Sequence, residues 1–183
     1  VNKEGKRFIS ELTTRDVTSA AVSKQTGGVS YEIFDQKVRN KVKQTGATFE
    51  LGLAKEGNTI HELAAAAGID PDNLEKTMTD YNRYAENGKD PEFHRPDGFP
   101  KVDKPKYYAI EITPAIHYYM GGLTIDGKTR VINTKGQPIK GLFAAGEVTG
   151  GVHGKNRLGG NSISETITFG RIAGTQAVKA VKQ

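Results

Sequence analysis

The sequence predicts an α/β chain in two parts: a mixed helix and strand region over residues 1–113, and a glycine-rich part over residues 114–183. Two observations lead to this division. Alternating and helical apolar patterns follow one another through the first part. The glycines are unevenly spread, because nine of the 22 lie in residues 1–120 and thirteen in residues 121–183. Glycine at such density marks backbone that turns tightly or approaches a ligand closely.

Three strands and one long loop are expected in the first part. Short apolar or alternating runs predict strands at Arg7–Ile9, Val29–Phe34 and Tyr107–Thr113. The segment from Asp90 to Pro105 contains four prolines, which cannot continue a helix. We expect this segment to be a loop at which the chain crosses between subdomains.

Four helices are expected in the same part, each beginning at a side chain that can cap it. Their predicted spans run from Asp16 to about Lys24, from Asp35 to about Lys43, from Thr59 to Gly68, and from Asp70 to Gly88. Thr59 and Glu62 have the spacing of a capping box. The last helix has a stripe of apolar residues at helical spacing, which predicts core packing: Leu74, Met78, Tyr81 and Tyr84.

The second part is expected to form a hairpin and a long terminal helix. Thr129–Thr134 and Gly141–Ala145 flank the turn residues Lys135 and Gly136. Gly141–Ala145 is predicted to be a buried strand that leads directly into a glycine turn. The apolar spacing from Ser162 to Lys182 predicts the helix.

Composition excludes several classes of protein. The chain has no cysteine, so disulfide scaffolds, thiolate nucleophiles and Cys-ligated metal sites are excluded. No run approaches the roughly 18 apolar residues that a membrane span needs. A net charge of +5 favours acidic partners without requiring nucleic acid. The compartment stays open between bacterial periplasm and cytoplasm.

The glycine-rich stretch Gly146–Asn161 (GEVTGGVHGKNRLGGN) is the strongest candidate for a binding site. Glu147 lies at the end of a predicted strand, where a carboxylate commonly accepts hydrogen bonds from the hydroxyls of a nucleotide sugar. The helix start at Ser162 and Ile163 offers backbone N–H groups to a phosphate or to the pyrimidine edge of a flavin. The alternative is a glycine loop before a capped helix, with no ligand.

Two cationic candidates could hold a carboxylate. Arg157 stands among glycines, and His117 precedes Gly121 and Gly122. A guanidinium binds a carboxylate bidentately, and an imidazole can add a hydrogen bond. Each residue taken singly is more often structural. The remaining histidines lack metal-ligand spacing and are assigned nothing: His61, His94 and His153.

The motifs taken together resemble the fumarate reductase/succinate dehydrogenase flavoprotein family. HYYMGG at 117–122 and GLFAAGEVTGGVHGKNRLGGNSISETITFGRIAG at 141–174 resemble its C-terminal part, and GKDPEF at 88–93 adds to the likeness. GKRFISELTTRD at 5–16 resembles the capping-domain segment with the catalytic arginine. The GEVTGG form, and the chain end soon after the FGRIAG helix, are similar to the soluble flavocytochrome c type branch.

The resemblance implies a fold and a division of the chain. Residues 1–113 would be the C-terminal portion of the capping domain, and residues 114–183 the C-terminal segment of a Rossmann-like FAD-binding domain. No GxGxxG motif occurs in the chain, so it would form the final third of an enzyme. We expect this portion alone to be inactive.

The resemblance also implies a role for each site residue. Arg15 matches the arginine that donates a proton to the substrate double bond. His117 and Arg157 match the pair that grips the substrate carboxylate, and Gly160 matches a backbone position that lines the substrate. The implied FAD contacts are Glu147, Ser162, Ile163 and Tyr118.

The implied reaction is reduction of fumarate to succinate in anaerobic respiration, with hydride transfer from flavin N5. Another enoate, urocanate or an acrylate, would suit the same scaffold. The implied partners are the N-terminal part of the same flavoprotein and an electron-donor domain or protein. A different class, a non-catalytic fragment that binds acidic ligands or nucleic acid, is suggested only by the basic charge balance.

Overall fold

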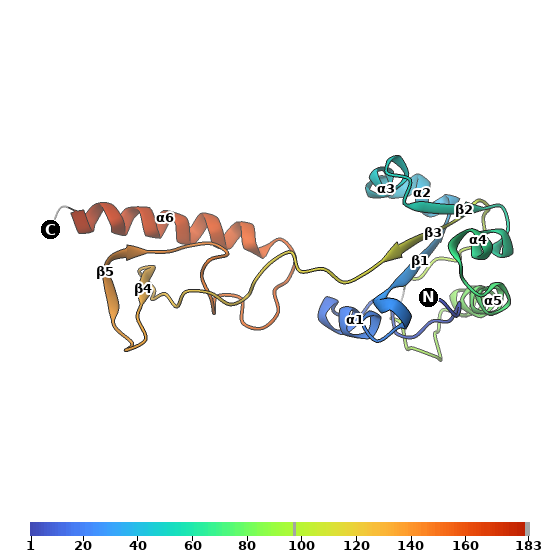
Figure 1. The fold of residues 1–183 in the computed structure, drawn as a ribbon, viewed down its shortest axis with the longest axis horizontal. Helices are drawn as coiled ribbons and strands as arrows, with labels where there is room; N and C mark the ends of the chain where they lie inside the picture. The colour runs from blue at the N-terminus through green and yellow to red at the C-terminus, as the bar shows by residue number, and fades with distance from the viewer. Residues whose placement is uncertain (97, 182–183) are drawn as a thin grey trace. The chain divides into compact units, whose positions relative to one another are not determined.

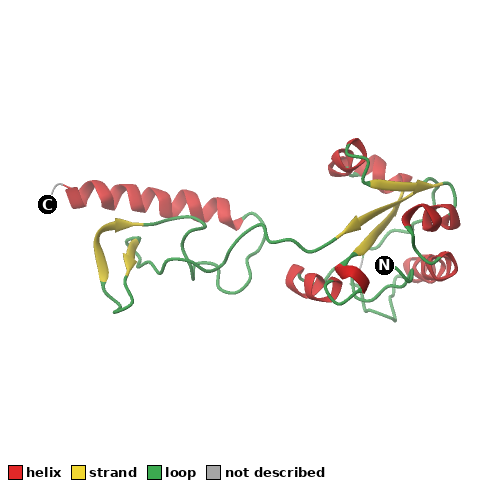
Figure 2. Ribbon diagram, viewed as in Figure 1, coloured by secondary structure: helices red, strands yellow, loops and turns green. Residues whose placement is uncertain are grey.

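The computed structural model describes residues 1–96 and 98–181. The chain forms two compact units, Val1–Pro114 and Ala115–Gln183, and each is described by itself. Figure 1 labels the elements, and Figure 2 separates helices from strands and loops.

The sheet of the first unit has three antiparallel strands in the order β1-β3-β2. They are β1 (Ser30–Asp35), β2 (Ala54–Gly57) and β3 (Tyr107–Ile112). Tyr31 lies opposite Glu111, and Lys55 lies opposite Ala109. The predicted strands at Val29–Phe34 and Tyr107–Thr113 are confirmed within one residue. The sequence missed β2, because its residues AKEG carry no aromatic or β-branched side chain.

The predicted strand at Arg7–Ile9 is wrong, because this segment is a loop. Its conformation brings the buried Arg7 side chain into an ion-pair cluster. The Arg7 side chain, 5% exposed, contacts the carboxylates of Glu11 and Asp90, each at 2.7 Å. The residue that does pair with the outer edge of β1 is Val1, which exchanges backbone hydrogen bonds with Tyr31.

The helices of the first unit are α1 to α5, and their ends follow local capping signals. They span Arg15–Val22, Gln36–Lys41, Gly46–Glu50, Ile60–Ala67 and Pro71–Asn87. Thr59 accepts a hydrogen bond from Glu62 N, and Asp70 accepts one from Asn73 N, as the predicted caps require. Gly68 and Gly88 adopt the left-handed conformation that ends α4 and α5.

Two predicted helix boundaries are corrected. Thr14, not Asp16, occupies the N-cap position of α1, because the backbone is already helical at Arg15. The Asp35 cap of α2 is confirmed, since its carboxylate accepts from Val38 N. That helix ends at Lys41 rather than Lys43, because Val42 is extended and a short 3₁₀ turn follows.

The core of the first unit lies where α4 and α5 pack beside the sheet. Leu74 is fully buried, Met78 is 6% exposed, and the half-buried Tyr81 packs against the core, so these three members of the predicted stripe are confirmed. The half-buried Tyr84 is not part of this core cluster. The described residues of the proline-rich segment form a loop, as predicted. Asp35, fully buried, fastens it by accepting hydrogen bonds from the backbone N–H groups of Asp103 and Lys104.

The second unit consists of a hairpin and the long helix α6. The hairpin strands are β4 (Arg130–Ile132) and β5 (Pro138–Phe143), and α6 spans Asn161–Val181 and lies against β5. The predicted hairpin and helix are confirmed, although Lys182 lies outside the described residues. The second strand of the hairpin spans Pro138–Phe143 and not the predicted Gly141–Ala145. The predicted burial of Gly141–Ala145 is wrong, because Gly141 and Leu142 are exposed and the other three residues are only half-buried. Within the described residues β5 pairs only with β4, which leaves much of its surface uncovered.

No described helix combines the length and apolar character that crossing a lipid bilayer would require.

Candidate functional site

Two glycine-rich segments of the second unit lie side by side and form the base of the site. Leu123 N donates to Val148 O at 2.8 Å, and Gly150 N donates to Leu123 O at 3.0 Å. A Cβ atom on Gly122 would lie 2.3 Å from Val148 O, so only glycine permits this approach. The pairing brings the segment that follows His117 against the loop that begins at Gly146.

A hydrogen bond fixes the first carboxylate of this loop. The backbone N–H of Tyr119 donates to Glu147 Oε1 at 2.9 Å. The Glu147 side chain is otherwise exposed. Its position suits a group that accepts hydrogen bonds from sugar hydroxyls.

An aromatic ring links the two segments at a second point. The Cζ atom of Arg157 lies 4.4 Å from the centre of the Tyr118 ring. On the same ring, the His153 imidazole makes an edge-type contact with centroids 5.8 Å apart. Arg157 is only 7% exposed, and its Nη1 donates to Leu158 O at 3.2 Å. The guanidinium is therefore confined by packing, whereas His117 is exposed.

The phenol of Tyr118 stays neutral in this setting. Desolvation raises the pKa of Tyr118, and the Glu165 carboxylate raises it further, while the Arg157 guanidinium partly opposes both effects.

The start of α6 supplies the third part of the site. Gly160 adopts a left-handed conformation (φ +86°), and its carbonyl accepts from Ile163 N at 3.0 Å. The first turn of an α-helix carries backbone N–H groups without intrahelical partners and the positive end of the helix dipole. Ile163 is 66% exposed, so this helix start is accessible.

Glu165 is a structural residue of the site that the sequence reasoning missed. Its side chain lies on α6, is 6% exposed, and accepts a hydrogen bond from Gly146 N at 3.0 Å. It therefore ties the helix to the turn that carries Glu147. The sequence did contain a signal for this residue, because Glu165 is the one charged residue in the segment SISETITF at 162–169.

The donor set of this region fits part of a flavin dinucleotide. A fixed carboxylate suits the ribose hydroxyls, and an accessible helix start suits the electron-rich pyrimidine edge. No described residues form a group of three or more histidine or carboxylate side chains that could hold a metal ion.

The predicted site residues are divided between the two units. Arg15 is the first residue of α1 in the first unit, and it is exposed. The other seven lie in the second unit: His117, Tyr118, Glu147, Arg157, Gly160, Ser162 and Ile163.

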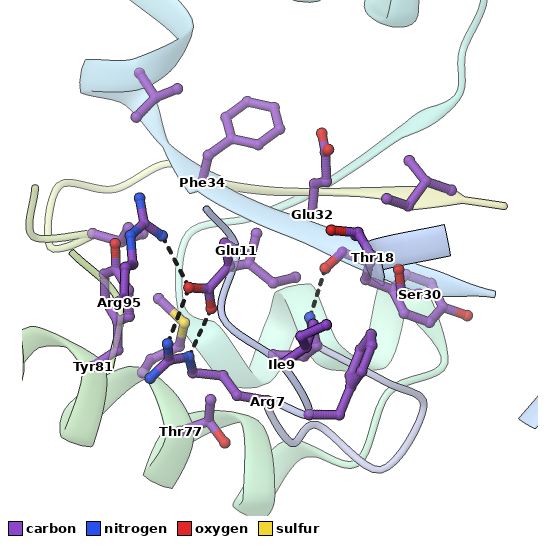
Figure 3. Close-up of a pocket in the computed structure, with 18 of the residues that line it drawn as sticks. Arg7, Ile9, Glu11, Thr18, Ser30, Glu32, Phe34, Thr77, Tyr81 and Arg95 are labelled. Atoms are coloured by element: carbon purple, nitrogen blue, oxygen red, sulfur yellow. Dashed lines mark hydrogen bonds and ion pairs between the residues drawn. The ribbon is translucent and has the colours of Figure 1, made fainter. Parts of the chain in front are cut away.

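The first unit has a separate pocket of about 450 Å³ that none of the predicted site residues lines. Figure 3 shows the ion pairs on one wall, where Glu11 lies between Arg7 and Arg95. Val1, β1 and α5 also contribute to the lining. The charged side chains of this wall pair with one another, and the residues that line the pocket form no catalytic arrangement.

Comparison with known families and proteins gives a consistent result. The family described as "FAD binding domain" matches residues 1–163. A Shewanella frigidimarina protein named fumarate reductase (cytochrome) is 49% identical over 100% of this chain and 32% of its own length. Urocanate reductase of Eggerthella lenta is 40% identical over 97% of this chain and 30% of its own length. NADH:acrylate oxidoreductase of Vibrio harveyi is 44% identical over 97% of this chain and 18% of its own length.

Solved structures agree with the sequence relatives. A flavocytochrome c3 fumarate reductase in its open conformation matches 98% of this chain and 32% of that chain, with a TM-score of 0.82 and 48% identity. A 3-ketosteroid delta1-dehydrogenase from Sterolibacterium denitrificans matches 100% of this chain and 38% of that chain, with a TM-score of 0.76 and 27% identity. The chain thus spans about a third of the length of the fumarate reductases it matches.

Proposed function

Because the chain belongs to the FAD binding domain family, we propose that it is part of an FAD-dependent reductase of an α,β-unsaturated carboxylate. Fumarate is the first candidate substrate, and its product would be succinate. The relatives named fumarate reductase support fumarate, and those named for urocanate and acrylate define the alternatives.

The observation that carries this proposal is the confined guanidinium of Arg157. It is nearly buried and is held against Tyr118, beside the segment that carries His117. A cation fixed in this way favours an anionic carboxylate over a neutral ligand such as a steroid, because a carboxylate can neutralise the charge and pair bidentately with the guanidinium.

Each residue has a defined task in the proposed reaction. His117 and Arg157 hold one carboxylate and draw electron density from the adjacent double bond. Gly160 lines the substrate through its backbone. Glu147 and the backbone at Ser162 and Ile163 hold FAD, with Tyr118 beside them. When bound and reduced, FAD supplies the hydride.

Arg15 would donate the proton to the neighbouring alkene carbon. A guanidinium normally remains charged, so it can act as an acid only if another group returns a proton at once. We propose that residues outside this chain provide that return, together with the groups that bind the second carboxylate.

The rest of the flavoprotein is the proposed partner of the second unit. Val131 is the one buried hydrophobic residue in the part of this unit that the structure describes, so the unit has little core of its own. Its exposed apolar side chains are unusually many, including Ile116 (77%), Leu158 (78%), Ile163 (66%) and Ile167 (60%). With so little core of its own and so many exposed apolar side chains, the unit would be covered by the remainder of the FAD-binding domain.

The open edge of β1 is a second proposed contact with the rest of the protein. Val1 and Tyr31 exchange two backbone hydrogen bonds of 2.8 Å, the pattern of an antiparallel strand pair. A further strand on this edge would hydrogen-bond Ile33, which lines the 450 Å³ pocket together with Val1 and Tyr31. In the full-length protein the Ile33 amide should then exchange hydrogen as slowly as that of Glu32, which faces β3. Exchange at the rate of an exposed amide would contradict the contact.

Variants of the full-length enzyme test the proposed activity. Arg157→Ala should raise KM for fumarate about 10- to 150-fold, since hydrogen bonds to charged groups contribute about 1.5–3 kcal/mol, and should also lower kcat. Lys155→Ala, an exposed cation on the same loop, is the matched control. Unchanged fumarate affinity in Arg157→Ala would refute the carboxylate role.

The proton donor and the substrate need separate experiments. Arg15→Lys should abolish turnover while FAD stays bound, and near-normal activity would exclude Arg15 as the donor. Competition among fumarate, urocanate and acrylate, followed by oxidation of a reduced dye, identifies the preferred enoate.

A further inference from the structure

Tyr118 lies between two cationic or titratable side chains of the glycine loop. The Arg157 guanidinium is positioned over the ring at 4.4 Å, and the His153 imidazole meets the ring at an interplanar angle of 69°. The three side chains come from two segments that are joined by the close backbone approach at Gly122. They form one stack, which we name the Arg157–Tyr118–His153 stack.

The contacts in the stack differ in kind. The guanidinium and the aromatic face attract one another electrostatically, and partial desolvation strengthens that attraction. The imidazole acts through packing, because its Nε2 atom is buried and has no hydrogen-bond partner among the described residues. His153 therefore packs against the ring, and the ring packs against the guanidinium.

We propose that Tyr118 and His153 are positioning residues that set the place and tilt of Arg157 for carboxylate binding. This inference rests on the proposed function of Arg157. Tyr118 would then have a second role besides its predicted contact with FAD. His153, to which the sequence motifs assign no role, would position Arg157 as well. Tyr118 and His153 therefore affect affinity for the carboxylate through Arg157, without touching the carboxylate themselves.

Pairs of variants in the full-length holoenzyme separate ring contact from hydrogen bonding. Tyr118→Phe and His153→Phe keep a ring in place, whereas Tyr118→Leu and His153→Ala remove it. The measured quantity is the inhibition constant of succinate, a non-reacting dicarboxylate, referred to enzyme with bound FAD. We expect the two Phe variants to stay within about 2-fold of wild type and Tyr118→Leu to weaken succinate about 2- to 30-fold, the range for cation–π contacts. His153→Ala should weaken it less, in the same direction.

A double-mutant cycle distinguishes positioning from a general structural effect. In an Arg157→Ala background, Tyr118→Leu should cause no further loss of succinate affinity, because the group that it positions is gone. Additive losses would overturn the inference, and so would a His153→Phe variant as impaired as His153→Ala. If Arg157→Ala alone left succinate affinity unchanged, the proposed function itself would fail. If Tyr118→Leu does not fold, His153→Ala replaces it in the same cycle.

Discussion

Replacing Glu165 by alanine should loosen the turn that carries Glu147, a proposed FAD contact. The Glu165 carboxylate, 6% exposed, accepts from Gly146 N at 3.0 Å, and Gly146 is itself buried. The alanine variant leaves that N–H without a partner in a place that water reaches poorly. Hydrogen bonds to charged groups contribute about 1.5–3 kcal/mol, which corresponds to an FAD affinity weaker by up to about 10- to 150-fold.

The assay measures FAD binding by the full-length protein. The cofactor is removed and then returned in steps, and flavin fluorescence monitors its binding. Glu165→Gln is the matched control, because its amide oxygen can accept from Gly146 N while its NH₂ group faces the hydroxyl of Thr166. This variant should stay within about 3-fold of wild type. Wild-type affinity in Glu165→Ala would refute the reasoning, and equal damage in both variants would show that charge, not hydrogen bonding, matters.

Two further predictions concern the first unit. Burial alone would raise the pKa of Asp90, but hydrogen bonds from Arg7 and from nearby backbone N–H groups outweigh it and hold that pKa well below its usual range. The ionised Asp90 carboxylate stabilises the fold at pH values above the pKa that this group has in the unfolded chain. That stabilisation is lost as pH falls, so thermal stability should decline below about pH 4. Asp90→Asn should flatten this decline and lower stability at pH 7 by about 1–3 kcal/mol, and an unchanged acid profile by circular dichroism would contradict the pairing. Gly57→Ala should lower the free energy of unfolding by about 1–3 kcal/mol, because its Cβ atom would lie 2.3 Å from Leu63 N. Gly46→Ala is the control, because the space around Gly46 is open. Equal melting temperatures for the two variants would disprove the clash.

Local signals in the sequence were sufficient for much of the fold. The caps at Thr59 and Asp70 act within three residues of themselves, so the helices that they begin are readable from the chain alone. The core stripe of α5 follows from helical periodicity. The resemblance of the glycine loop to a flavoprotein family was likewise a matter of linear motif, and the family match agrees with it.

Contacts between distant segments could not be read in this way. β2 is a strand because β3 pairs with it, although its own residues have little strand preference. Arg7 lies in a loop where it pairs with Asp90, which is 83 residues away in the sequence. The pairing of β2 and the position of Arg7 both depend on which distant segments come into contact. The spacing of apolar residues along the chain does not contain that information.

The candidate site divides along the same line. The sequence by itself determined its residue types: a carboxylate at Glu147, a guanidinium at Arg157 and a helix start at Ser162. Only the tertiary structure decided that Tyr118 stacks on Arg157 and that Glu165 turns inward to hold Gly146. The physical reason is that glycines permit a close backbone approach between two segments, and that approach, not the local sequence, sets which side chains become buried together.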